Sequence, residues 1–211
     1  MTDSSVLEAE PAVAAQIFGD RIDLVRRYVA DLAQHGEELG LIGPLELPRL
    51  WTRHVVNCGL LAPLLVSGRV GDIGSGAGLP GLVLAAARPD STLVLIEPME
   101  RRVDWLRAEA ERLELENVEV VRARAEEVEL DGWLDQATAR AVSALSKLIP
   151  LTAPLVKTGG QLLLMKGARI DDEIAAARKV IARHHLVDVE ARELGVGLVS
   201  ETTRVFIATL D

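Results

Sequence analysis

The residues whose types and spacing best suit chemistry form one stretch, Val70–Gly81, with the sequence VGDIGSGAGLPG. Glycine stands at positions 74, 76, 78 and 81, where it permits positive φ and lets a ligand approach the backbone without meeting a Cβ. A strand-like segment leads into this loop, and a helix is predicted to follow from Leu79 to Ala87, with Pro80 in its first turn. Because the first amides of a helix lack intrahelical partners, the stretch predicts a phosphate or nucleoside cradle.

Two classes of cofactor suit such a loop. Residues 76–81 match the dinucleotide pattern G-x-G-x-x-G, and Glu97 follows about 20 residues later, where a carboxylate would hold ribose hydroxyls. Asp72, however, stands two residues ahead of the alternating glycines, an arrangement that resembles motif I of the class I methyltransferases, which use S-adenosylmethionine. An acid near the cationic amino group of that cofactor is favourable by Coulomb attraction. Only a helix and a hairpin are predicted after residue 166, too little for the substrate domain of a nicotinamide enzyme, so S-adenosylmethionine is favoured.

The chain around the loop alternates between strand and helix patterns. Near-continuous apolar runs are typical of parallel strands that are covered on both faces. The predicted strands are residues 69–73, 92–97, 117–121, 135–139, 161–166, 186–192 and 203–209, and the predicted helices are 79–87, 99–113, 145–156 and 171–183, with a turn or helix at 125–128. The last two strands are joined by a short loop and should be antiparallel neighbours. The predicted fold class is α/β, a class I methyltransferase Rossmann-like sheet, mostly parallel with an antiparallel C-terminal strand, plus an N-terminal helical extension.

The segment ahead of the first strand has helical spacing of its own. Residues 6–35 predict two helices with a break at Gly19-Asp20, residues 36–48 predict a loop, and residues 50–66 predict one or two short helices. We therefore expect a helical extension, residues 1–66, packed on a core of residues 67–211 that forms the S-adenosylmethionine-dependent methyltransferase domain.

Composition narrows the class of protein further. The 211 residues carry a formal net charge of -9, which argues against broad, non-specific binding of nucleic acid but leaves room for a local basic site. The single cysteine, Cys58, cannot form an internal disulfide and reads as a buried small hydrophobe. The first five residues lack the features of a signal peptide, and the longest apolar run, residues 58–66, is too short to cross a bilayer, so a cytoplasmic protein is expected. The histidines have no spacing suited to a metal, and no metal is predicted; they are His35, His54, His184 and His185.

Further motifs extend the methyltransferase resemblance over most of the chain. They are Arg53-His54, Gly74–Gly81, Glu97-Pro98 followed by Arg101-Arg102, Arg124-Ala125-Glu126-Glu127, Arg140-Ala141, Met165-Lys166-Gly167 and Thr203-Arg204. Together they resemble the RsmG family (glucose-inhibited division protein B), bacterial enzymes that methylate N7 of a guanine in 16S ribosomal RNA.

This resemblance implies roles for individual residues. The cofactor would be bound by Asp72, Gly74, Ser75, Gly76, Gly78, Leu79, Glu97, Ala125, Glu126 and Arg140, with Glu97 on the ribose and Ala125-Glu126 beside the adenine. The catalytic candidates are Arg140, Lys166 and Arg204, of which Arg140 would lie beside the cofactor carboxylate or the target base. Lys166 and Arg204 would contact RNA phosphates or O6 and N7 of the guanine, acceptors that suit Arg or Lys. Arg49, Arg53 and His54 would extend this RNA-binding rim, although a capping or core role is as fitting for His54.

The resemblance also implies a substrate, which the sequence around the fourth strand suits. N7 of guanine has an in-plane lone pair and no proton, so methyl transfer to it needs alignment and no obligatory general base. The Asp-Pro-Pro-Tyr or Asn-Pro-Pro-Tyr motif of amino-group methyltransferases is absent after that strand, where Ala139-Arg140-Ala141-Val142 stands instead. The resemblance implies the 530 loop of the decoding region as the target, and loss of the enzyme is then expected to give low-level streptomycin resistance. The sequence leaves naked RNA, an assembly intermediate and the whole small subunit open as the substrate, and the acidic charge with few aromatics favours the small subunit or an assembly intermediate. A monomer is the default expectation.

Two other functions remain open from the sequence. A methyltransferase of the same fold could act on a small molecule or another RNA, but an aromatic-lined acceptor pocket is disfavoured by an aromatic content of only 3%. A non-catalytic nucleotide-binding module is the second alternative. A cofactor titration would distinguish it from a methyltransferase, whose fold S-adenosylmethionine should protect and nicotinamide dinucleotides should not.

Overall fold

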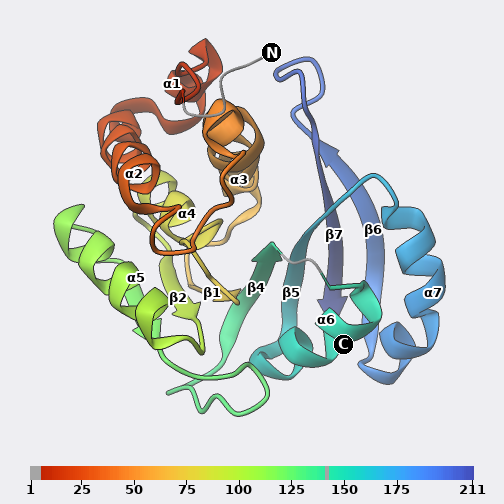
Figure 1. Cartoon of the computed structure of the whole chain (residues 1–211). Coiled ribbons are helices and arrows are strands. Elements are labelled where there is room, and N and C mark those ends of the chain that lie inside the picture. The colour runs from red at the N-terminus through yellow and green to blue at the C-terminus, as the bar shows by residue number, and fades with distance from the viewer. Residues whose placement is uncertain (1–5, 141–142) are drawn as a thin grey trace.

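The computed structural model describes residues 6–140 and 143–211 and centres on one mixed β-sheet (Figure 1). Its seven strands lie in the order β3-β2-β1-β4-β5-β7-β6. They are β1 (Arg69–Ile73), β2 (Thr92–Ile96), β3 (Val118–Val121), β4 (Leu134–Arg140), β5 (Val156–Lys166), β6 (Leu186–Leu194) and β7 (Thr203–Leu210). β1 to β5 pair in parallel, and β7 runs antiparallel to both β5 and β6. The predicted mostly parallel sheet with an antiparallel C-terminal strand is confirmed.

Helices cover both faces of this sheet. They are α1 (Ala12–Phe18), α2 (Ile22–His35), α3 (Asn57–Gly59), α4 (Gly81–Ala87), α5 (Glu100–Arg112), α6 (Leu145–Thr152) and α7 (Ile170–Arg183), joined by short turns that include η2 (Leu47–Arg49) and the π-helical segment η3 (Leu50–Val56). One apolar core joins the N-terminal helices, α4 and α5 to one face, and a second joins α6 and α7 to the other. The crossovers thus change face between β1 and β4, which makes the carboxyl ends of these strands a topological switch point, where open α/β sheets bind ligands.

The helices that precede β1 share their core with the sheet. Val25, Val29 and Leu32 of α2 and Leu50 of η3 are buried in the same cluster as Leu82 of α4. This packing is what a helical extension on the core would show, although the boundary at residue 66 stays a prediction. Among the described residues, no helix is both long enough and apolar enough to span a membrane.

Several predicted element ends differ from the structure. The helix predicted from Leu79 begins at Gly81, because the Asp72 carboxylate accepts the Gly81 amide at 2.9 Å and the preceding residues form a turn. The helix predicted to reach Val156 ends at Thr152, and β5 begins at Val156, five residues before its predicted start, because Val156 already pairs with Leu134. Two residues of the predicted Ala139-Arg140-Ala141-Val142 motif, Ala141 and Val142, lie outside the described residues. So do residues 1–5, on which the expected absence of a signal peptide rests.

Candidate active site at the carboxyl edge of the sheet

The sequence-predicted site residues gather at the carboxyl ends of the parallel strands. The glycine loop follows β1, Glu97 follows β2 directly, and Arg140 is the last residue of β4. In the sheet, Asp72 is paired with Thr138, two residues before Arg140, so the loop and this arginine flank the switch point. Residues that lie 68 positions apart in sequence are thereby brought to one crevice.

The glycine loop adopts a backbone that requires glycine and leaves one side open. Gly74, Gly76 and Gly78 have φ values of 76°, 57° and 97°, in the left-handed region. A Cβ added at Gly74 would meet no atom within 4 Å, so the loop borders open space there. Two buried donors brace the loop from behind, because Tyr28 Oη and Trp105 Nε1 donate to the Ala77 carbonyl at 3.0 and 2.9 Å.

Asp72 is fully buried beneath this loop. Its Oδ2 accepts the Gly81 amide at 2.9 Å, and its backbone carbonyl accepts the Ser75 hydroxyl at 2.8 Å. The other carboxylate oxygen, Oδ1, is buried without a hydrogen-bond partner in the described part of the chain. Burial raises the pKa of Asp72 to about 7, although the charge of Arg140 opposes this shift. A buried acid with one unmatched oxygen suits a ligand that brings a donor or a positive charge.

Glu97 links the end of β2 to the glycine loop. Only 2% exposed, it accepts the Gly76 amide at 2.9 Å through Oε2 and the Met99 amide at 3.0 Å through Oε1. Each carboxylate oxygen has further acceptor capacity, so the fixed side chain can also receive hydroxyl donors. Ala125 and Glu126 lie in the turn after β3, at the same edge of the sheet, and Glu126 is exposed.

Arg140 is held at the end of β4 by residues from the N-terminal segment. Its Nη2 contacts His54 Nδ1, and its Nη1 donates to Cys58 Sγ at 3.5 Å. Cys58 is fully buried, as predicted, but its thiol also touches the site, which its reading as a small hydrophobe did not include. Burial raises the pKa of Cys58, so the thiol stays neutral.

A polar cavity of about 670 Å³ opens beside Arg140. Three more predicted cations line it: Arg53, Lys166 and Arg204. Lys166 and Arg204 are directly paired across β5 and β7. Lys166 is already engaged, because its Nζ donates to the Ser143 carbonyl at 2.7 Å and lies 2.7 Å from Glu173 Oε2, with the side chain 4% exposed. Arg204 has a looser partner, Glu193, at 3.7 Å.

The other two predicted RNA-binding residues do not line this cavity. Arg49 donates to Glu46 at 2.7 and 2.9 Å, and His54 is buried with Nε2 2.6 Å from the same carboxylate. Burial raises the pKa of Glu46, but the hydrogen bonds from Arg49 and His54 outweigh that effect and lower the pKa to about 2. Burial and the charge of Arg140 in turn lower the pKa of His54 to about 4, so its ring is neutral at physiological pH.

Sequence reasoning missed two residues near the site. Glu46 lies in a loop between two prolines, where no local pattern points to His54. Asn57 lines the cavity, and its Oδ1 is buried without a partner among the described residues. The helical spacing of residues 53, 54, 57 and 58 was an available signal, because positions three and four apart on a helix are neighbours.

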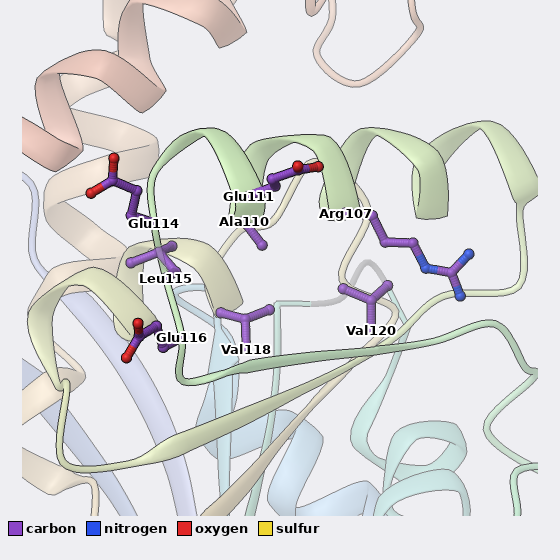
Figure 2. A pocket seen from close by; sticks show the side chains of 8 residues that line it. All are labelled: Arg107, Ala110, Glu111, Glu114, Leu115, Glu116, Val118 and Val120. Atoms are coloured by element: carbon purple, nitrogen blue, oxygen red, sulfur yellow. The ribbon is translucent and has the colours of Figure 1, made fainter.

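Other parts of the described surface suit the chemistry less well. A hollow of about 340 Å³ lies between α5 and β3 (Figure 2). Its floor is apolar, with Val118 and Val120, but Glu111, Glu114 and Glu116 surround it against one cation, Arg107. This charge would repel a polyanion. Within residues 6–140 and 143–211, no three His, Cys, Asp or Glu side chains are grouped as metal ligands.

Solved structures share this architecture. The fold matches a precorrin-6y C5,15-methyltransferase from Geobacter metallireducens with a TM-score of 0.56 and 18% identity, over 77% of this chain and 91% of the other. It also matches M. jannaschii TYW2 in complex with AdoMet with a TM-score of 0.58 and 19% identity, over 76% of each chain. The fold is that of the class I S-adenosylmethionine-dependent methyltransferases.

Sequence comparisons define the family. The family model for rRNA small subunit methyltransferase G (GidB) matches residues 21–199. A curated protein named ribosomal RNA small subunit methyltransferase G from Clavibacter michiganensis subsp. michiganensis is 64% identical over 97% of both chains. A protein of the same name from Leifsonia xyli subsp. xyli is 59% identical over 100% of both chains. Another, from Corynebacterium glutamicum, is 45% identical over 92% of this chain and 88% of the other. The chain belongs to the rRNA small subunit methyltransferase G family.

Proposed function

We propose that this protein transfers a methyl group from S-adenosylmethionine to N7 of one guanine in 16S ribosomal RNA. The observation that carries the proposal is the juxtaposition at one edge of the sheet of a glycine loop with an open side and a cavity lined by Arg53, Arg140 and Arg204. Membership of the rRNA small subunit methyltransferase G family supports an rRNA substrate.

The residues around the glycine loop fit the cofactor. Gly74 and Gly76 leave room for it, Glu97 can receive its ribose hydroxyls, and the unmatched Oδ1 of Asp72 suits the cationic methionine end. In our proposal the turn at Ala125-Glu126 borders the adenine, and Ser75, Gly78 and Leu79 complete the binding loop. When bound, S-adenosylmethionine supplies an electrophilic methyl group on a sulfonium.

The acceptor side needs alignment more than acid or base chemistry. Guanine N7 reacts through a lone pair and carries no proton, so no protein base has to remove one. Arg140 and Arg204 can donate to O6 of the base or to RNA phosphates. Positive charge formed on the methylated base is offset, in this proposal, by the phosphates of the RNA itself.

Lys166 has a more restricted position than the two arginines. Because its ammonium is bound by Glu173 and by the Ser143 carbonyl, we propose that it holds Ser143 in place beside the cavity. Its charge still contributes to the attraction of RNA into the cavity, where it lies beside Arg204.

The charge of the whole chain bears on the form of the substrate. A net charge of -9 favours weak binding to free RNA and dependence on a structured particle. We therefore propose that the protein acts as a cytoplasmic monomer on the 530 loop within the small subunit or an assembly intermediate. Loss of the gene is then expected to give low-level streptomycin resistance.

Mass mapping of 16S ribosomal RNA from cells with and without the gene tests this function. We expect one 7-methylguanosine in the 530 loop to be lost on deletion and restored by the wild-type gene, but not by a gene carrying Arg140→Ala. A matched control, Arg192→Ala, changes an exposed arginine on β6 and should restore the methyl group fully. Unchanged methylation in the deletion strain would refute the proposal.

A further inference from the structure

The contacts around Arg140 form a chain that begins in the N-terminal segment. Glu46 contacts His54, and His54 contacts Arg140, which lines the acceptor cavity. Glu46 and His54 do not line that cavity. Their link to the site is therefore through the arginine, over a separation of 86 residues between His54 and Arg140.

The donors and acceptors fix the state of the His54 ring. A guanidinium has only donors, so His54 Nδ1 must accept from Arg140. Nε2 must then carry the proton and donate to Glu46 Oε2, 2.6 Å away. Only the neutral Nε2–H tautomer satisfies both partners, because a protonated ring would present an N–H to the guanidinium.

The far end of this chain is also held. Arg49 donates to both oxygens of Glu46, at 2.9 Å from Nε to Oε2 and 2.7 Å from Nη2 to Oε1. A fixed carboxylate fixes the tautomer and the orientation of the imidazole, as in other carboxylate–histidine pairs. The imidazole and the Cys58 thiol then orient the guanidinium, which carries five N–H donors in all and can direct others into the cavity.

We propose that Glu46 and His54 are positioning residues that set the guanidinium of Arg140 against the bound guanine or the cofactor carboxylate. This inference rests on the proposed function, since it takes the cavity beside Arg140 as the acceptor site. It makes the N-terminal segment a working part of the active site as well as a cover for the sheet.

Two substitutions of His54 separate the two hydrogen bonds. In His54→Asn the amide oxygen can take the place of Nδ1 and accept from Arg140, but the side chain is too short to reach Glu46. In His54→Gln the amide nitrogen can take the place of Nε2 and donate to Glu46, but Arg140 loses its acceptor.

Steady-state kinetics on small subunits from a deletion strain reads out the difference. We expect His54→Gln to lower kcat by about 10²-fold with little change in the KM for subunits, as misplacement of a positioned group does. His54→Asn should keep kcat within about tenfold of the wild type, because Arg140 retains its acceptor. Equal loss in both variants at matched melting temperatures would mean a merely structural role and would overturn the proposal.

The tautomer of His54 gives a test that does not depend on activity or on a variant that folds. In ¹⁵N-labelled wild-type protein, NMR should show the neutral Nε2–H tautomer throughout the range from about pH 5 to 8. A protonated ring or an Nδ1–H tautomer near neutral pH would overturn the hydrogen-bond chain. Failure of the wild-type protein to methylate any RNA would instead refute the proposed function, and the NMR result would still decide whether His54 accepts from Arg140.

Discussion

The buried carboxylate of Asp72 should make the stability of the protein depend on pH in a specific way. Burial raises the pKa of Asp72 from its ordinary value of 3.8 to about 7. Between these values the unfolded chain loses this proton while the folded protein keeps it, so the folded protein loses stability as the pH rises from about 4 to 7. At 1.36 kcal/mol per pH unit, the full loss is about 4 kcal/mol.

Asp72→Asn removes this ionisation and keeps an acceptor for the Gly81 amide. Relative to the wild type, the free energy of unfolding of the variant should therefore rise by about 4 kcal/mol between about pH 4 and pH 8. Urea unfolding without cofactor, followed by circular dichroism at several pH values, measures this difference. The same substitution should weaken binding of S-adenosylmethionine, which in the wild-type protein should tighten as the pH rises through about 7 because the ionised acid attracts the amino group.

A second aspartate provides the control. The pKa of Asp135 is lowered, mainly by its hydrogen bond with Lys157. The stability that ionised Asp135 contributes is therefore fully present at any pH above the ordinary pKa of an aspartate. The difference between Asp135→Asn and the wild type should stay constant from about pH 5 to pH 8. If the difference for Asp72→Asn were equally constant, the burial of an unmatched carboxylate beneath the glycine loop would be refuted.

Three further predictions concern the loop and its supports. Glu97→Gln should weaken S-adenosylmethionine binding by about 10- to 100-fold in calorimetry, since a charge-assisted hydrogen bond contributes about 1.5–3 kcal/mol. The control variant Glu100→Gln changes an exposed side chain and should leave binding unchanged. Gly74→Ala should lower the free energy of unfolding by about 1–2 kcal/mol, because φ is 76°, and should also reduce cofactor affinity; unchanged affinity would mean that the open side of the loop is not the binding side. Tyr28→Phe removes a bond to the Ala77 carbonyl and should cost about 1 kcal/mol of stability in urea unfolding, and no loss would show that Trp105 alone braces the loop.

The fold was largely predictable because its main signals are local. The predicted bounds of β1, residues 69–73, agree with the structure, and α5 lies within the predicted residues 99–113. The start of β5 was missed because Lys157 to Gly160 are polar or glycine, and their pairing depends on β4, which is distant in sequence. The start of α4 was misplaced for a similar reason, since its first amide is bound by Asp72, nine residues earlier.

The position of a candidate site residue was predictable where the topology alone places it. Glu97 directly follows β2 and Arg140 ends β4, the two strands on either side of β1, and the carboxyl ends of parallel strands lie at one edge of the sheet. The contacts of His54 with Glu46 and Arg140 could not be predicted, because they depend on how the N-terminal helices pack against the end of β4. The ion pair between Lys166 and Glu173 could not be predicted either, because it depends on the packing of α7 beside β5.

Methylation of small subunits by the purified protein would show directly whether it transfers a methyl group from S-adenosylmethionine to guanine N7. Small subunits from a deletion strain would be incubated with S-adenosylmethionine that carries a labelled methyl group, and the 16S RNA would be digested and analysed by mass spectrometry. We expect close to one labelled methyl group per subunit, on N7 of a single guanine, and none with the Arg140→Ala variant. Label on another atom or base, or no transfer by the folded wild-type protein, would contradict it.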